Sequence, residues 1–108
     1  MKVKFSDESL LDLRNIEDYL LENWNTKIYE DFLTKLDETI KIICGGNVVF
    51  QKYENTVYHK ILITKHNTLI YSIDHDVLKI VKILQNFQNP DDNYDSLKII
   101  FNYPLSNR

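Results

Sequence analysis

The chain has 108 residues, of which 44% are hydrophobic and 27% charged, and its formal net charge at pH 7 is −3. This length and composition predict one globular domain with a single core and exclude a largely disordered chain. No apolar run approaches the roughly 18 residues that cross a bilayer. The N-terminal residues MKVKFSDES lack the apolar stretch of a signal peptide, so we expect a cytoplasmic protein without membrane contact.

The charge is unevenly distributed along the chain. Residues 1–47 carry an acidic excess, whereas residues 48–90 carry a small basic excess. This bias is too weak to predict a broad phosphate-binding surface. Cys44 is the only cysteine, which excludes a disulfide framework and favours a small buried thiol.

The first part of the chain predicts a strand followed by a helix. Lys2–Phe5 alternates polar and apolar residues, as a short strand does. Ser6 is the expected N-cap, and Asp7 and Glu8 would place negative charge in the first turn, where the helix dipole favours it. One apolar stripe at spacings of three and four follows, and it predicts a helix that ends near Asn23 or Trp24: Leu10, Leu13, Ile16, Leu20 and Trp24.

A second helix is predicted directly after the first. Asn25 or Thr26 would cap it, and Gly45-Gly46 would end it, because glycine readily adopts the left-handed conformation beyond a helix C-terminus. Its apolar stripe comprises Tyr29, Phe32, Leu33, Leu36, Ile40 and Ile43. A connection of two or three residues requires an antiparallel hairpin, which must pack on another layer to bury its stripes.

The third part of the chain predicts a three-stranded meander over residues 57–84. Two short polar breaks, Lys65-His66-Asn67 and Asp74-His75-Asp76, separate runs rich in β-branched and aromatic residues. Residues 48–50 are expected to form a short extended piece, and residues 51–56 a polar loop. The predicted fold class is therefore α+β: an N-terminal strand and an antiparallel two-helix hairpin packed on a small antiparallel sheet. This domain would span residues 1–90, and the tail 91–108 would either add an edge strand or dock through its apolar residues.

This order of elements resembles the RelE/ParE toxin family of type II toxin–antitoxin systems. Leu11, Leu13, Ile16 and Tyr19, followed by Trp24, resemble the family's first helix, and Phe32, Lys35, Leu36 and Ile40 resemble its second. The segment 63–71, ITKHNTLIY, resembles the central hairpin, and Gln88-Asn89-Pro90 resembles the end of the last strand. The resemblance implies one of two activities: ribosome-dependent cleavage of mRNA in the RelE-like branch, or poisoning of DNA gyrase, with a role in plasmid stabilisation, in the ParE-like branch. It also implies a cognate antitoxin as partner.

Nuclease activity would require cationic and acid–base side chains clustered on the concave face of the sheet. The resemblance implies arginine in many relatives at three positions where this chain has His59, Ser72 and Phe87. The remaining candidates for catalysis are Lys52, His59, Lys60 and His75. The alternative for each is an ordinary strand or turn residue without a chemical role.

Metal and cofactor chemistry is not expected. Asp74-His75-Asp76 offers three potential ligands, but they cannot all converge from one tight turn. The sequence also has no glycine-rich phosphate loop and no Ser/His/Asp arrangement.

Gyrase poisoning is a binding event and places fewer demands on single side chains. We expect target or partner contacts at the hairpin turn and near the end of the last strand, through Tyr19, Trp24, Tyr29, Lys65, Phe87, Gln88 and Asn89. The alternative for the aromatic residues is a place in the core. We therefore predict a ParE-like toxin. The two alternatives are an mRNA endonuclease and a degenerate relative that binds antitoxin without toxicity.

Overall fold

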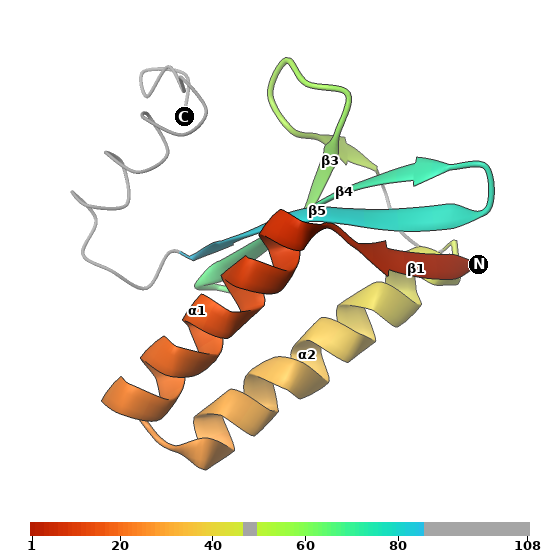
Figure 1. The fold of residues 1–108 in the computed structure, drawn as a ribbon. Coiled ribbons are helices and arrows are strands. Elements are labelled where there is room, and N and C mark those ends of the chain that lie inside the picture. The colour runs from red at the N-terminus through yellow and green to blue at the C-terminus, as the bar shows by residue number, and fades with distance from the viewer. Residues whose placement is uncertain (47–49, 86–108) are drawn as a thin grey trace.

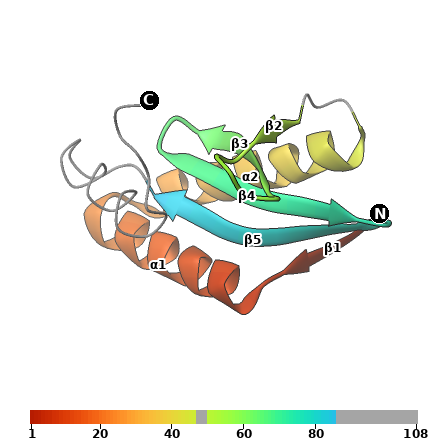
Figure 2. The same cartoon turned by 90° about the horizontal axis from the view of Figure 1, so that it is seen from above.

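A computed structural model describes residues 1–46 and 50–85 of the chain. Two helices cover one face of a five-stranded sheet, and no helix of the described residues covers the other, open face (Figures 1 and 2). In chain order the elements are β1 (Lys2–Phe5), α1 (Asp7–Asn23), α2 (Thr26–Cys44), β2 (Gln51–Lys52), β3 (His59–Thr64), β4 (Asn67–Asp74) and β5 (Val77–Gln85). The predicted α+β class and the helical hairpin are confirmed. The tail 91–108 and the residues 48–49 lie outside the described residues.

The sheet has the strand order β1-β5-β4-β3-β2. Strands β3, β4 and β5 form the expected antiparallel meander, but β1 pairs with β5 in parallel, so the sheet is mixed. The alternation of Lys2–Phe5 predicted a strand correctly. It contained no information about the partner or the direction of pairing, since β5 begins more than seventy residues later.

The N-terminus of α1 is fixed to β5 by a series of polar contacts. Ser6 is the N-cap: its side chain accepts a hydrogen bond from the N–H of Ser9, and its Oγ donates to the carbonyl of Val81 at 2.7 Å. One turn later, Asp12 accepts a hydrogen bond from the backbone N–H of Ile83 at 2.9 Å. Beyond the end of β1, residues at the N-cap and in the first turns of α1 therefore supply the hydrogen-bond partners for the backbone of the outer edge of β5. Asn25 caps α2 in the same way, and α2 ends before Gly45 and Gly46 as predicted.

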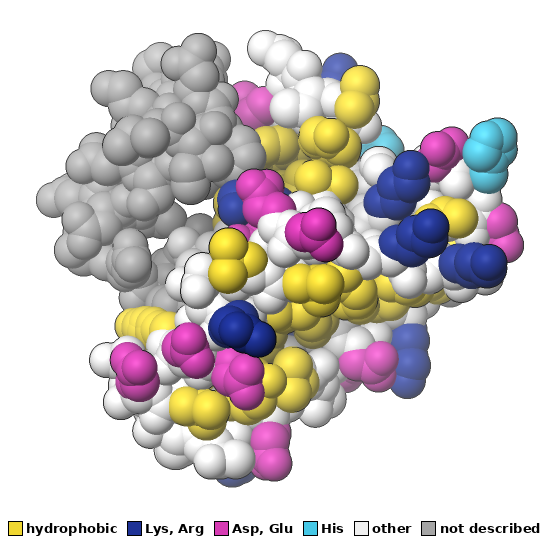
Figure 3. Space-filling model, viewed as in Figure 1, with side chains coloured by type: hydrophobic (Ala, Val, Ile, Leu, Met, Phe, Trp, Pro, Cys, Tyr) yellow, Lys and Arg dark blue, Asp and Glu magenta, His cyan; other side chains and the backbone are white. Residues whose placement is uncertain are grey.

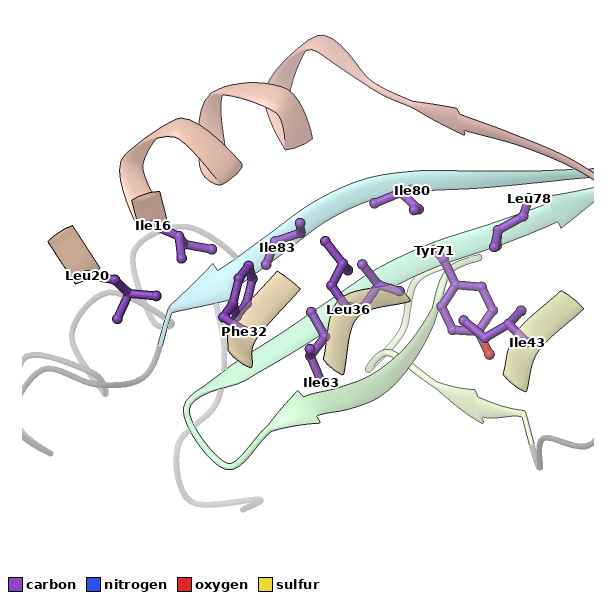
Figure 4. Packing of buried hydrophobic residues seen from close by; sticks show 11 residues of the cluster. Ile16, Leu20, Phe32, Leu36, Ile43, Ile63, Tyr71, Leu78, Ile80 and Ile83 are labelled. Carbon is purple, nitrogen blue, oxygen red and sulfur yellow. The ribbon is translucent and has the colours of Figure 1, made fainter. Parts of the chain in front are cut away.

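The main core lies between the helices and the sheet (Figure 4). Helix α1 contributes Ile16 and Leu20, whereas α2 contributes Phe32, Leu36 and Ile43. The strands contribute a second layer of buried side chains: Ile63, Leu69, Tyr71, Leu78, Ile80 and Ile83. This arrangement confirms that neither helix buries its apolar stripe against the other helix alone.

Two residues of the predicted α1 stripe are not buried. Leu10 is 51% exposed and Trp24 is 63% exposed. At 3.6 residues per turn, Leu10 lies about 120° around the helix from Ile16, beyond the width of the buried face. The smaller Ser9 occupies the buried position in that turn. Trp24 is the residue after the helix, where the backbone leaves the helical conformation. A core position for Trp24 is therefore wrong.

The predicted polar loop at residues 51–56 is wrong for its first two residues. Gln51 and Lys52 form β2, which pairs with β3, and β3 begins at His59 rather than at Val57. Tyr53 then crosses to the open face of the sheet, where it is buried. There it forms a second apolar cluster with Ile70 and Leu84. The open face is therefore partly covered by its own loop.

Candidate functional site

Two of the four candidate catalytic residues lie together. Lys52 and His59 are direct partners in the ladder between β2 and β3. The ring of His59 lies 5.0 Å from the ring of Phe50 and 5.6 Å from that of Tyr71, between centroids. Because Tyr71 belongs to the main core, His59 faces the helices rather than open solvent. Its Nδ1 is buried and has no hydrogen-bond partner among the described residues.

The other two candidates lie elsewhere. Lys60 follows His59 in the same strand, so its side chain projects from the opposite face of the sheet. His75 occupies the turn between β4 and β5 with a φ of 58°, and its side chain is 94% exposed. Its Nε2 lies 3.6 Å from Oδ1 of Asp74. The structure therefore divides the four residues among the helix-covered face, the open face and a distant turn.

The open face carries a group of lysines that the sequence analysis did not single out. Lys4 and Lys79 are direct partners in the parallel ladder of β1 and β5, and Lys2 precedes Lys4 on the same face. Figure 3 shows Lys and Arg side chains gathered at this end of the sheet beside acidic ones. Lys79 contacts Asp74 at 3.5 Å, which offsets part of its charge. Only the parallel pairing of β1 brings these lysines together, so no local pattern in the sequence could have indicated the group.

Ser72 also lies on the open face, as the partner of Lys79 across the ladder of β4 and β5. It is half-buried and contributes no charge. The neighbouring centre of the face is apolar, because Tyr53, Ile70 and Leu84 occupy it. Phe87, the other position expected on this face, lies outside the described residues.

Two of the expected contact residues line a groove at the tip of the helical hairpin. Tyr19 and Trp24 border a cavity of about 300 Å³ between the hairpin and the turn that joins β3 to β4. The groove is mainly apolar, and its lining also includes Leu20, Ile28, Asp31, Phe32, Lys35, Thr64, His66 and Asn67. It therefore combines an apolar floor with a few charged side chains at its rim.

The remaining expected contact residues are placed as follows. Tyr29 is half-buried and packs against the main core. Burial raises the pKa of its hydroxyl, and the charge of Glu17 and a hydrogen bond to it act in the same direction. Lys65 is exposed in the turn beside the groove. Gln88 and Asn89 lie outside the described residues.

Neither a metal site nor a membrane segment was found in the described part of the chain. Within residues 1–46 and 50–85, no three His, Cys, Asp or Glu side chains lie close enough to hold one metal ion. In the same residues, neither helix is long and apolar enough to span a membrane.

Comparison with solved structures shows which known proteins share this fold. No family model and no curated protein matches the sequence. Among solved structures, the chain is similar to one described as the chromosomal ParDE TA system from P. aeruginosa, with a TM-score of 0.66 and 12% identity. That match covers 79% of this chain and 95% of the other.

Two further structures have the same fold. The YoeB dimer from Staphylococcus aureus matches with a TM-score of 0.56 and 19% identity, over 82% of this chain and 98% of its own. YafQ from E. coli matches with a TM-score of 0.55 and 10% identity, over 78% of this chain and 91% of its own. A two-helix hairpin on one face of a five-stranded mixed sheet thus defines a class of small α+β domains. Within that class, the chain has the fold of the RelE/ParE toxins, as its sequence predicted.

Proposed function

We propose that the chain is the toxin of a type II toxin–antitoxin pair, that it acts by binding a cytoplasmic protein target such as DNA gyrase, and that a cognate antitoxin neutralises it. The fold supports the first part, since it is shared with structures described as the ParDE TA system and a YoeB–YefM toxin–antitoxin complex. The same similarities, together with a DinJ–YafQ complex, support the antitoxin as partner. The fold alone does not distinguish gyrase poisoning from RNA cleavage.

The separation of the candidate catalytic residues favours a binding activity over RNA cleavage. Phosphodiester cleavage needs a base, an acid and a cation within hydrogen-bond reach of one phosphate. His59 faces the core, Lys60 projects from the other side of the sheet, and His75 is in a remote turn. These residues therefore cannot act on a single phosphate in the arrangement that the structure describes.

The exposed hairpin tip supplies a surface that suits a protein target. Trp24 is 63% exposed, and Leu21 and Ile28 beside it are 43% and 38% exposed. Aromatic residues that combine a large apolar area with few rotatable bonds dominate binding energy at protein interfaces. Trp24, which the core does not use, is the residue that we expect to contribute most to target binding.

The test adds the purified chain to DNA gyrase and plasmid and measures cleaved DNA and supercoiling. We expect linear plasmid to accumulate or supercoiling to be lost, and Trp24→Ala to reduce this effect. Leu62→Ala is the matched control, because Leu62 is an equally exposed apolar residue, at 62%, that does not line the groove. No effect at a large excess of the chain would refute gyrase as the target. Antitoxin binding without any effect on gyrase or translation would indicate a degenerate toxin.

The lysines of the open face favour one second candidate, ribosome-dependent cleavage of mRNA. Lys4 and Lys79 are adjacent, and like charges directly opposite each other in a sheet are destabilising, so a bound anion would stabilise this pair. A ribosome-dependent cleavage assay on a defined mRNA tests this candidate. Cleavage that is lost in a Lys4→Ala/Lys79→Ala double variant, and retained in Lys41→Ala on the solvent face of α2, would support the nuclease over the gyrase poison.

A further inference from the structure

Exposed apolar side chains border the groove at the hairpin tip. Trp24, Leu21 and Ile28 are 63%, 43% and 38% exposed, and they adjoin the buried Leu20 and Phe32 of the groove floor. Single exposed apolar residues need no explanation, whereas contiguous ones usually mark a surface that another segment covers.

The chain leaves the described fold beside this groove. Gln85, the last residue of β5, is the ladder partner of Asn67, which lines the groove. Residues 86–108 follow Gln85. Helix α1 contacts the end of β5 through Asp12 and Ile83, and Trp24 lies twelve residues further along the chain. At 1.5 Å per residue this corresponds to about 18 Å along the helix.

The length and composition of the following segment match this distance. Residues 86–96, NFQNPDDNYDS, are mostly polar, and a random coil of eleven residues has a root-mean-square span of roughly 17–20 Å. Residues 97–101, LKIIF, form the next apolar run, in which only Lys98 is charged. The polar segment contains Asp91, Asp92 and Asp95, and the turn at the rim of the groove contains Lys65 and His66. These aspartates can therefore pair with Lys65 beside the groove and with Lys35 in its lining, whereas Asp31 in the lining has the same sign of charge.

We propose that residues 97–101 of the same chain occupy the hairpin-tip groove and cover Trp24. A tether of this length gives the segment an effective concentration in the millimolar range, which favours it over a second copy of the chain at ordinary protein concentrations. An external protein that uses Trp24 must first displace the segment. The docking itself does not depend on the proposed toxin function and is tested separately from it.

Trp24 is the only tryptophan of the chain, so its fluorescence reports directly on the groove. The experiment compares the emission maximum and the acrylamide quenching of the full chain with those of Ile100→Asp and Phe101→Asp. We expect blue-shifted emission and weak quenching in the unmodified chain, and a red shift with stronger quenching in both variants. Lys98→Gln is the matched control, because it changes the same segment without removing an apolar side chain. Ile28→Asp, on the groove side, is expected to reproduce the red shift while far-ultraviolet circular dichroism remains unchanged.

Because the segment and the groove belong to the same chain, the emission maximum should not change with protein concentration. A blue shift that disappears on dilution would assign the groove to a second copy and overturn the proposal. Emission of a water-exposed indole in the full chain, unchanged by Ile100→Asp and Phe101→Asp, would overturn it as well. A blue shift that appears only when an antitoxin or gyrase is added would assign the groove to that partner instead. None of these outcomes depends on plasmid cleavage, so failure of the docking proposal is distinguishable from failure of the toxin proposal.

Discussion

Replacing Asp12 with alanine should destabilise the fold more than any other single change in charge among the described residues. Asp12 Oδ2 accepts a hydrogen bond from the N–H of Ile83 at 2.9 Å, and Oδ1 accepts one from Lys82 Nζ at 3.2 Å. The side chains of Asp12 and Lys82 are only 14% and 16% exposed. The substitution would therefore leave a buried backbone N–H and a largely buried ammonium group without their main acceptor.

The magnitude follows from these two losses. A hydrogen bond to a charged group contributes about 1.5–3 kcal/mol, and an unsatisfied buried donor costs about 1–3 kcal/mol. Removing one partner of a buried ion pair costs about 3–5 kcal/mol. Glu8 lies 4.0 Å from Lys82 and retains part of the attraction, which places the expected loss near the lower limit, at about 3 kcal/mol. For a domain of this size, that loss lowers the melting temperature by roughly 12–24 °C.

Urea denaturation followed by circular dichroism measures this loss. Asp12→Asn should cost less than Asp12→Ala, because the amide oxygen still accepts from Ile83 while the charge is lost. Lys82→Met in the Asp12→Ala background should recover part of the stability, since it removes the unpaired charge. Asp37→Ala is the control: Asp37 pairs with Lys41 at 3.0 Å, but both side chains are more than half exposed, so the midpoint should hardly change. A loss below about 1 kcal/mol in Asp12→Ala would refute the reasoning.

Three further predictions concern the aromatic residues. Trp24→Ala should change the stability of residues 1–85 little, because the ring is 63% exposed. Thermal denaturation of a chain that ends at Gln85 checks this. A loss of several kcal/mol would instead place the ring in the core. Tyr71→Phe should raise the free energy of unfolding by about 1 kcal/mol, since the buried hydroxyl of Tyr71 has no hydrogen-bond partner among the described residues; a decrease in thermal stability would show that the hydroxyl is bonded. Burial raises the pKa of Tyr71 above its usual 10.0, so the hydroxyl ionises in the unfolded chain at a lower pH than in the folded one. The free energy of unfolding should therefore fall as the pH rises past about 10. Tyr71→Phe should reduce that fall, and an unchanged pH profile in this variant would contradict the prediction.

The local signals of the sequence were sufficient for most of the fold. Ser6 and Asn25 cap the two helices where their side chains predicted it, because capping depends on residues only three positions apart. The two polar breaks of the meander became its two turns, one of which contains His75 at a φ of 58°. The resemblance to the RelE/ParE toxins also came from the order of these local elements. Each of these features is set by neighbours within one helical turn or one hairpin.

The candidate site was harder to predict, because its residues are brought together or separated over long distances in the sequence. The alternation of residues placed His59 and Lys60 on opposite faces of a strand, but only the packed helices decided which face is covered. The parallel pairing of β1 with β5 brought Lys4 beside Lys79, although seventy-five positions separate them in the chain. Trp24 continues the apolar stripe of α1 in sequence, yet the helix ends one residue before it, and its side chain stays 63% exposed at the border of the groove. Local propensity determined the elements of this protein, whereas long-range packing decided which of their side chains remain exposed for binding.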